Sequence, residues 1–322
     1  MTMFGRKTGN ILIIKTDSLA SFVATEPLFQ AIRDAYPKAR ISLITQASLQ
    51  RIARAAPYFD QVAAVPNLAE PETRKAFVKQ LQAQKFSQVF DLSADEDAKK
   101  LQSAMGPFGP KWQSAAPPRR RRGEAEFAGY QKLMTSAGLS VEPRLPDLSW
   151  ALAARKDSAN MQPSWFGISG AFGLLMPSAD PALRWPPVNY ARLAQLMARE
   201  NIMPVLAGGK EVHSFGDEIA HSAPEIVDLT GKTDHLQLVA LAQDASFFVT
   251  DSAEEVHLAL SVGLRGVMIK KSASAAPPEG RNVVLVTAQG DLGDAKAELV
   301  WKTLQNMGLT PNDKPQKRAA GH

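Results

Sequence analysis

The feature that most limits the fold of this chain is a regular alternation of short apolar runs with amphipathic stretches. In the first half, strand-like runs cover residues 11–16, 39–45, 60–66 and 86–93, and helical patterns separate them. Strands that are apolar throughout are typical of a parallel sheet covered by helices on both faces. A second series of the same kind begins at Trp165 and ends near Met307. The sequence therefore predicts an α/β protein with two Rossmann-like, doubly wound parallel-sheet domains.

The segment between the two series sets the predicted domain boundaries. From about Gly106 the pattern gives way to Pro, Gly and Arg, and residues 139–162 have the composition of a linker. We predict one domain at residues 1–150, a second at residues 151–310, and a polar tail at residues 311–322. Two domains of this type are expected to leave a cleft between the carboxyl ends of their sheets, where a ligand binds.

Composition excludes several functional classes. The chain has 322 residues, of which 45% are hydrophobic and 21% charged, as in an ordinary globular protein. It has no cysteine, which excludes disulfides, thiolate metal sites and cysteine nucleophiles. Its five histidines form no metal-binding motif, so we expect no metal and no cofactor. With no run resembling a signal peptide or a membrane span, a cytoplasmic location is expected.

Part of the net charge of +5 is concentrated in one place, where a run of four arginines follows two prolines. One interpretation is a solvated loop, which is the usual fate of a charge run. The other is a contact with anionic lipid headgroups or an anionic glycan, which would place the protein peripherally on the inner membrane. No recognition motif accompanies the run, so nucleic acid is not an expected partner. The residues concerned are Arg119, Arg120, Arg121 and Arg122.

The stretch SFFVTDSAEEVHLA at residues 246–259 is a strand followed by a helix, the place where doubly wound folds usually bind phosphate. Here two glutamates, Glu254 and Glu255, open the helix. The sequence from Ser252 to Glu255 also fits a capping box, in which the serine caps the N–H of the glutamate and the carboxylate returns to the N–H of the serine. We therefore predict that this helix supplies its own anion.

Five blocks of the chain resemble the ADP-heptose:lipopolysaccharide heptosyltransferases of glycosyltransferase family 9. In chain order they are ILIIKTDSLASFVATEPLFQAI, RWPPVNYARLAQLM, VLAGGKE, DLTGKTDHLQLVALAQDA and TDSAEEVHLALSVG, and the resemblance extends to about Leu309. It implies the two-domain GT-B fold, a metal-independent inverting sugar transfer in lipopolysaccharide biosynthesis, and an ADP-sugar held mainly by the C-terminal domain. The acceptor then belongs to the N-terminal domain.

The base position departs from the family pattern. The family's first loop reads SLGD, and the aspartate is thought to deprotonate the acceptor; here residues 18–21 read SLAS, which puts Ser21 at that position. A serine hydroxyl cannot accept the proton at neutral pH, and loss of a positioned base lowers a rate about 10²–10⁴-fold. Asp17, one turn earlier, is a substitute only if the loop is remodelled.

The donor side departs as well. Leu183 stands where the family has a phosphate-binding lysine, with Arg184 as a partial substitute. Ser252 replaces the aspartate of the elbow motif and Glu254 its glycine, while Asp251 could serve after a one-residue shift. His257 is retained, although it is equally compatible with a buried structural role. The donor-binding candidates implied by the resemblance are Lys15, Ser178, Arg184, Gly208, Gly209, Glu211, Lys232, Thr233, Asp251, Ser252, Glu254 and His257.

Two functional hypotheses follow. In one, the protein is a catalytically impaired homologue, a pseudoenzyme that binds or scaffolds, with a protein as a further conceivable partner. In the other, it is an active glycosyltransferase with a shifted donor site in which Asp17 or Asp251 substitutes. Because the base, the lysine and the aspartate-glycine pair are lost together, the first hypothesis is favoured.

Overall fold

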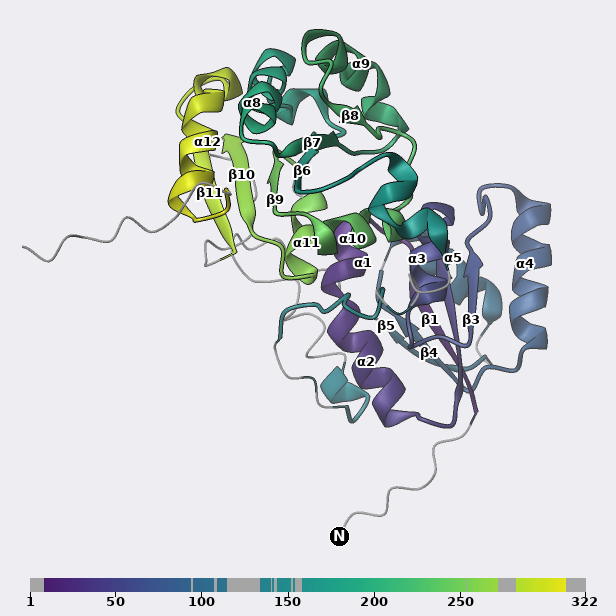
Figure 1. The fold of residues 1–322 in the computed structure, drawn as a ribbon. Coiled ribbons are helices and arrows are strands. Elements are labelled where there is room, and N and C mark those ends of the chain that lie inside the picture. Colours follow the sequence, from purple (N-terminus) through teal and green to yellow (C-terminus); the bar gives the residue numbers. More distant parts are fainter. Residues whose placement is uncertain are drawn as a thin grey trace, which may run out of the picture. The chain divides into compact units, whose positions relative to one another are not determined.

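The computed structural model describes residues 9–93, 95–106, 109–114, 134–139, 141, 144–151, 153, 158–252, 254–271 and 282–310. The chain divides into two compact units, residues 1–150 and residues 151–322. Each is described below by itself (Figure 1).

The first unit contains a five-stranded parallel sheet in the order β3-β2-β1-β4-β5. Its strands are β1 (Asn10–Lys15), β2 (Arg40–Thr45), β3 (Gln61–Ala64), β4 (Gln88–Asp91) and β5 (Lys111–Ser114). The central strand β1 is buried from Ile11 to Lys15, which explains why its sequence shows no polar alternation.

Helices supply the packing partners of this sheet. They are α1 (Leu19–Ala24), α2 (Glu26–Ala35), α3 (Gln50–Ala55), which follows the 3₁₀ turn η1 (Ala47–Leu49), α4 (Pro71–Ala83) and α5 (Glu96–Met105). Leu12 and Ile14 of β1 belong to a buried cluster with Leu81 of α4 and Leu101 of α5. Because side chains alternate along a strand, the intervening Ile13 is directed to the opposite face of the sheet.

The pattern over residues 19–35 predicts one helix, but the structure has two. Pro27 has no N–H to donate to the carbonyl of Val23, so α1 ends at Ala24 and α2 begins at Glu26. Proline is favourable in the first turn of the new helix, where an N–H would lack a partner. The break makes α1 a helix of only six residues, and its N-cap is Ser18.

The second unit contains a six-stranded parallel sheet in the order β11-β10-β9-β6-β7-β8. Its strands are β6 (Phe172–Met176), β7 (Met203–Leu206), β8 (Val227–Asp228), β9 (Phe247–Thr250), β10 (Gly266–Lys271) and β11 (Val283–Ala288). Taken in order along the chain, the six strands follow the 3-2-1-4-5-6 arrangement of dinucleotide-binding domains.

The helices of the second unit cover this sheet. They are α8 (Pro187–Arg199), α9 (His213–Ser222), α10 (His235–Asp244), α11 (Glu255–Ser261) and α12 (Ala297–Asn306). Short 3₁₀ turns lie before β6 and between strands and helices. They are η2 (Ala159–Met161), η3 (Pro163–Phe166), η4 (Pro181–Leu183), η5 (Lys210–Val212) and η6 (Leu292–Asp294). One buried cluster of this unit includes Trp185 and Tyr190 with Leu304 of α12. The predicted fold class, two doubly wound parallel-sheet α/β domains, is confirmed.

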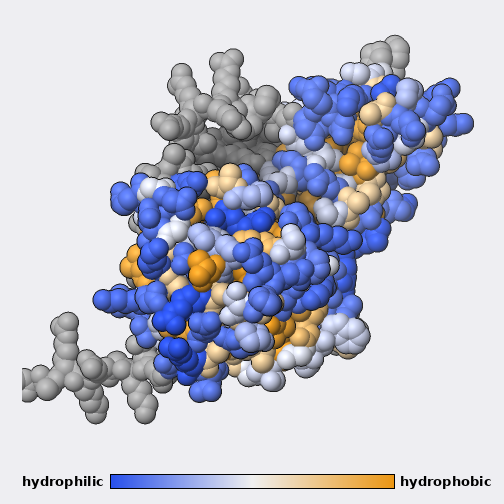
Figure 2. Space-filling model, turned by 90° about the horizontal axis from the view of Figure 1, so that it is seen from above, coloured by the Kyte–Doolittle hydropathy of each residue, from blue (hydrophilic) through white to orange (hydrophobic). Residues whose placement is uncertain are grey.

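Hydrophilic residues predominate on the face shown in Figure 2, where hydrophobic residues form only small groups. Among the residues described, the large hydrophobic side chains that are exposed include Leu145, Trp165 and Val188. None of the helices in this part of the chain combines the length and the apolarity needed to span a bilayer.

Candidate functional site

In each sheet the strand order reverses beside the first strand of the unit. The reversal lies between β1 and β4 in the first unit and between β6 and β9 in the second. Doubly wound sheets bind ligands outside the carboxyl ends of the strands at this point. The carboxyl ends of the two sheets therefore define one candidate site on each unit, and we name them the unit 1 edge and the unit 2 edge.

The unit 1 edge is organised by Lys15, the last residue of β1, which is 0% exposed. Its Nζ donates to Ser21 Oγ at 2.7 Å, to Asp17 Oδ2 at 2.9 Å and to the carbonyl of Leu92 at 3.2 Å. A buried ammonium needs such partners because it has lost its hydration. The result is that Asp17 and Ser21 bind the same cation.

Ser21 lies in the first turn of α1, and its N–H donates to the hydroxyl of the N-cap residue Ser18. Its own hydroxyl is buried against the Lys15 ammonium. The side chain of Asp17 is 32% exposed as a whole, but its Oδ1 is buried and has no hydrogen-bond partner. Asp17 was expected near the family base position only if the loop were remodelled. In the structure it is already there, because the Lys15 ammonium bonds to both Asp17 and Ser21.

A second network at this edge involves Ser93 and Asp95, two residues that are not among those predicted from the sequence. The Thr16 N–H donates to Ser93 Oγ at 2.6 Å, and the Thr16 hydroxyl donates to Asp95 Oδ2 at 2.5 Å. The other oxygen of Asp95 caps α5 by accepting the N–H of Ala98 at 2.8 Å. An aspartate directly before an amphipathic stretch is a helix N-cap signal, so Asp95 could have been predicted.

Asp251, at the end of β9, is the central residue of the unit 2 edge. Its Oδ1 accepts the N–H of Ser178 at 2.5 Å, and its Oδ2 accepts the N–H of Trp185 at 2.5 Å and the hydroxyl of Tyr190 at 3.1 Å. The side chain of Asp251 therefore holds the loop between β6 and α8 at both ends. We call these four residues the Asp251 clasp.

The clasp is buried, and burial raises the pKa values of its two ionisable side chains, Asp251 and Tyr190. Burial raises the pKa of Asp251 to about 7, against the opposing effect of its three hydrogen bonds. Burial, together with the neighbouring Asp251 carboxylate, also raises the pKa of Tyr190 well above its usual value. Because both oxygens of Asp251 accept internal hydrogen bonds, this carboxylate is directed into the protein.

Arg184 lies in the loop held by the clasp. Its Nε donates to the carbonyl of Ser178 at 2.7 Å, and its Nη2 donates to that of Ala179 at 2.9 Å. The guanidinium also stacks on the ring of Phe215, 4.6 Å from the ring centroid. These contacts give Arg184 a structural role in the loop, while the neighbouring Leu183 is 37% exposed and carries no charge.

The glycine turn after β7 is covered by a carboxylate. A Cβ placed on Gly209 would overlap the carboxylate of Glu211, and one on Gly208 would collide with Val212. Glycines at such a turn allow close approach to the backbone. In this chain it is Glu211 that makes the approach.

The turn after β8 carries two further donor-binding candidates. Lys232 is exposed, and its Nζ donates to the carbonyl of Asp228 at 2.8 Å. The following residue, Thr233, is half-buried. Lys232 is thus held near the end of β8 by a contact within its own turn.

The capping box predicted at the elbow does not form. Helix α11 begins at Glu255 and not at residue 253, so Glu255 is its first residue and Glu254 its N-cap. The Ser252 N–H donates to Thr250 Oγ1 at 2.9 Å, so the glutamate cannot take it. The Ser252 hydroxyl instead donates to the Glu255 carboxylate and accepts the N–H of Glu254 at 3.2 Å. Serine and glutamate do pair, but through their side chains.

Three glutamates concentrate negative charge at this edge. Burial is the main cause of the raised pKa of Glu255, and the charges of Glu254 and Glu211 raise it further. Glu211 from the turn after β7 and Glu254 from the start of α11 therefore act on the same carboxyl group. His257, one turn into α11, is half-buried. The predicted acceptor-side or membrane-side arginines Arg119 to Arg122 lie outside the described residues.

Comparison with known proteins identifies the family. The profile of glycosyltransferase family 9 (heptosyltransferase) matches residues 128–297, more than half of the chain. The chain belongs to glycosyltransferase family 9. The family predicted from the sequence blocks is thereby confirmed.

Two curated relatives match parts of this family 9 chain. Lipooligosaccharide heptosyltransferase 2 of Haemophilus influenzae is 32% identical over 93 residues, which are 27% of each protein. The protein of the same name from Haemophilus ducreyi is 27% identical over 121 residues, 34% of this chain and 35% of the relative. The matched segments thus span about a third or less of these relatives.

Solved structures match over almost the whole family 9 chain. The Escherichia coli ADP-heptose lps heptosyltransferase II has a TM-score of 0.75 at 19% identity, covering 92% of this chain and 98% of that one. The E. coli heptosyltransferase WaaC with ADP-2-deoxy-2-fluoro heptose has a TM-score of 0.71 at 17% identity, covering 92% and 99%. At these identities the similarity establishes the fold.

Proposed function

We propose that this family 9 protein has lost, or nearly lost, the transfer of heptose from ADP-heptose, and that it serves envelope glycan assembly as a binding protein. The observation that carries the proposal is the carboxylate of Glu211 on the backbone of Gly209. This turn and the start of α11 are where a doubly wound domain offers N–H groups to phosphate. Both places are already next to carboxylates of the chain.

Coulomb's law gives the size of the repulsion between these carboxylates and the phosphate of a nucleotide sugar. A carboxylate about 4 Å from a phosphate charge repels it by roughly 1–4 kcal/mol, depending on the local dielectric constant. Glu211 and Glu254 both contribute, because each raises the pKa of Glu255. No cation at position 183 offsets the repulsion, and Arg184 is committed to two carbonyls and a ring.

The unit 1 edge supports the same proposal. Ser21 has a hydroxyl that accepts a hydrogen bond from an ammonium group, an arrangement unsuited to removing a proton from an acceptor. Lys15 holds Asp17 and Ser21 in place from inside the unit. We therefore assign Lys15 a positioning role and not a direct contact with a donor.

Calorimetric titration with ADP and with ADP-heptose tests the proposal. We expect the unmodified protein to bind neither ligand more tightly than about 1 mM. The triple variant Glu211→Ala, Glu254→Gly, Leu183→Lys removes two repelling charges and adds a cation, so its affinity is expected to rise at least about tenfold.

Glu218→Ala is the matched control, because it removes an exposed carboxylate of α9 and is expected to leave affinity unchanged. Micromolar binding of ADP-heptose by the unmodified protein would contradict the closed donor site. If affinity rose equally in the control and in the triple variant, net charge and not the position of the carboxylates would be responsible.

A second candidate function is an active inverting heptosyltransferase in which Asp17 is the base. It is favoured by the partly exposed Asp17 carboxylate, which shares the Lys15 ammonium with the residue at the family base position. In that case the unmodified protein transfers heptose to a lipopolysaccharide acceptor, and Asp17→Asn lowers kcat about 10²–10⁴-fold. Ser21→Ala is the control that keeps the Asp17 carboxylate. An absence of transfer by the unmodified protein eliminates this candidate.

Partners beyond the nucleotide sugar remain predictions of the sequence. We propose that the run from Arg119 to Arg122 assists association with an anionic glycolipid or with the membrane surface. Solved relatives contain ADP or an ADP-heptose analogue, which makes an ADP-sugar the first ligand to test.

A further inference from the structure

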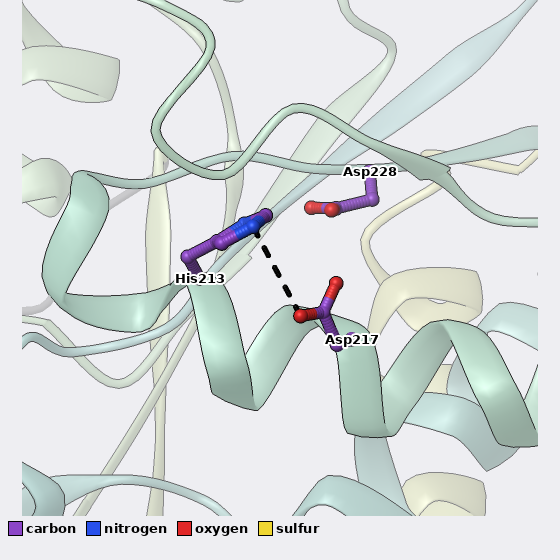
Figure 3. Close-up of side chains that lie close together, drawn as sticks. All are labelled: His213, Asp217 and Asp228. Carbon is purple, nitrogen blue, oxygen red and sulfur yellow. Dashed lines mark ion pairs between the residues drawn. The ribbon is translucent and has the colours of Figure 1, made fainter.

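Three side chains that can bind a metal converge in the second unit, on the segment from α9 to β8. His213 is the first residue of α9, Asp217 lies one turn later on the same helix, and Asp228 ends β8. Figure 3 shows the imidazole and the two carboxylates directed toward one another. Their ligand atoms all lie within 4.8 Å of each other, and His213 Nε2 lies 3.9 Å from Asp217 Oδ2.

These distances are close to those of a coordination sphere. Nitrogen and oxygen ligands bind Zn²⁺ at about 2.0–2.2 Å, so two ligands of one ion are at most about 4.4 Å apart. The 3.9 Å pair satisfies this limit already. The side chain of Asp217 is 66% exposed, so a small rotation of it can adjust the remaining distances to this limit.

A glycine on α9 permits the convergence. A Cβ on Gly216 would lie 2.7 Å from Thr230 Oγ1 and 3.1 Å from Asp228 Oδ1. Any larger residue would therefore push the helix away from Asp228. Glycine inside a helix is less favourable than alanine, and its presence in this turn therefore has a packing reason.

The buried residue Thr230 orients the imidazole. Its hydroxyl donates to Asp228 Oδ1 at 2.7 Å and lies 3.3 Å from His213 Nδ1. A hydroxyl that donates to Asp228 accepts from Nδ1, and this leaves Nε2, on the side of Asp217, as the nitrogen placed to bind an ion. Metal-binding histidines are oriented in the same way, by a hydrogen bond from the nitrogen that does not bind the ion.

We propose that His213, Asp217 and Asp228 bind a divalent transition-metal ion such as Zn²⁺. One imidazole nitrogen with two carboxylates suits zinc or nickel better than calcium or magnesium, which prefer oxygen ligands alone. With side-chain exposures of 52% for His213 and 66% for Asp217, water can complete the coordination. The proposal does not depend on the function proposed above.

Lys232 competes with the ion for Asp228, so its removal is expected to raise the metal affinity, whereas removal of a ligand lowers it. Its Nζ lies 3.4 Å from Asp228 Oδ2 and is anchored by a 2.8 Å hydrogen bond to the Asp228 carbonyl. An ion on Asp228 must compete with this ammonium. Removing the ammonium should therefore strengthen metal binding, whereas removal of an ordinary structural contact would not.

The experiment is calorimetric titration of zinc chloride into the full chain without a histidine tag. We expect saturable one-to-one binding that is lost in His213→Ala and in Asp217→Asn. Thr230→Val should weaken binding about tenfold, as expected for a group that orients a ligand. Lys232→Met should tighten it, and His221→Ala, which removes an exposed histidine from the other end of α9, should leave it unchanged.

Circular dichroism of each variant confirms that a lost signal does not reflect unfolding. The proposal is overturned if the unmodified chain shows no saturable binding up to about 1 mM zinc, or if His213→Ala and Asp217→Asn bind as tightly as the unmodified chain. Equal affinity of the Lys232→Met variant and the unmodified chain would also contradict it, because Asp228 would then not be a ligand.

Discussion

Replacing Asp251 with alanine is expected to lower the free energy of unfolding by about 3 kcal/mol or more. The substitution leaves the N–H groups of Ser178 and Trp185 and the hydroxyl of Tyr190 buried without an acceptor. Each unsatisfied group lowers stability by about 1–3 kcal/mol. Urea denaturation at pH 6 measures the effect.

Asp180→Ala is the matched control, since Asp180 lies in the same loop and caps only η4 through the N–H of Ala182. Its loss is expected to lower stability by about 1 kcal/mol. Equal losses in the free energy of unfolding of the two variants would show that the clasp stabilises the protein no more than an ordinary helix cap does.

The same carboxyl group gives stability a defined dependence on pH. Burial raises the pKa of Asp251 from 3.8 to about 7, so between these two values the folded chain binds more protons than the unfolded chain. The contribution of Asp251 to the free energy of unfolding therefore falls as pH rises through this window, by at most about 1.4 kcal/mol per pH unit, and is constant above it. Urea denaturation of the unmodified protein and Asp251→Asn from pH 5 to pH 8 should show the difference shifting in favour of the variant. Parallel curves would contradict the raised pKa.

The second large effect is expected for Glu26→Ala, at about 3 kcal/mol or more of lost stability. The buried Glu26 carboxylate accepts the Tyr58 hydroxyl at 2.5 Å, Nη1 and Nη2 of Arg144 at 2.7 Å and 2.9 Å, and the N–H of Asp147 at 3.0 Å. Burial raises the pKa of Tyr58, and its hydrogen bond to Glu26 raises it further, so the phenol keeps its proton and needs this acceptor. Thermal and urea denaturation measure the loss.

Glu96→Ala provides the comparison for Glu26. Glu96 also opens a helix and also pairs with a cation, Lys99, but its side chain is 78% exposed. Surface pairs of this kind contribute about 0–1 kcal/mol. A loss for Glu26→Ala no larger than that of Glu96→Ala would mean that the buried network is not a stabilising element of the first unit.

The fold was predictable because its signals are local. The apolar runs that became β1, β2, β4 and β9 needed only the rule that strands buried on both faces lack polar alternation. The break between α1 and α2 was predictable as well, since Pro27 within a helical pattern marks the start of a new helix. Apolar periodicity alone, without this proline, predicts one helix over residues 19–35.

The candidate site was less predictable because its contacts are made between distant segments. Lys15 reaches the carbonyl of Leu92 only because β1 and β4 are neighbours in the sheet. The capping box failed for a related reason: its S-x-x-E spacing is present, but Thr250 takes the serine N–H and the helix begins later. A pattern of four residues shows which groups can pair, and the surrounding structure decides which of them do.

The Asp251 clasp also affects how an aspartate in this position should be understood. Its partners are two main-chain amides and a phenol of the same unit, so they fix the loop between β6 and α8 whether or not a nucleotide is present. A chain that abandoned sugar transfer altogether would still gain stability from this residue. The presence of the aspartate in a distant homologue is therefore not by itself a sign of catalysis, and its replacement is expected to weaken ligand binding by destabilising the loop even if the carboxylate never touches a sugar.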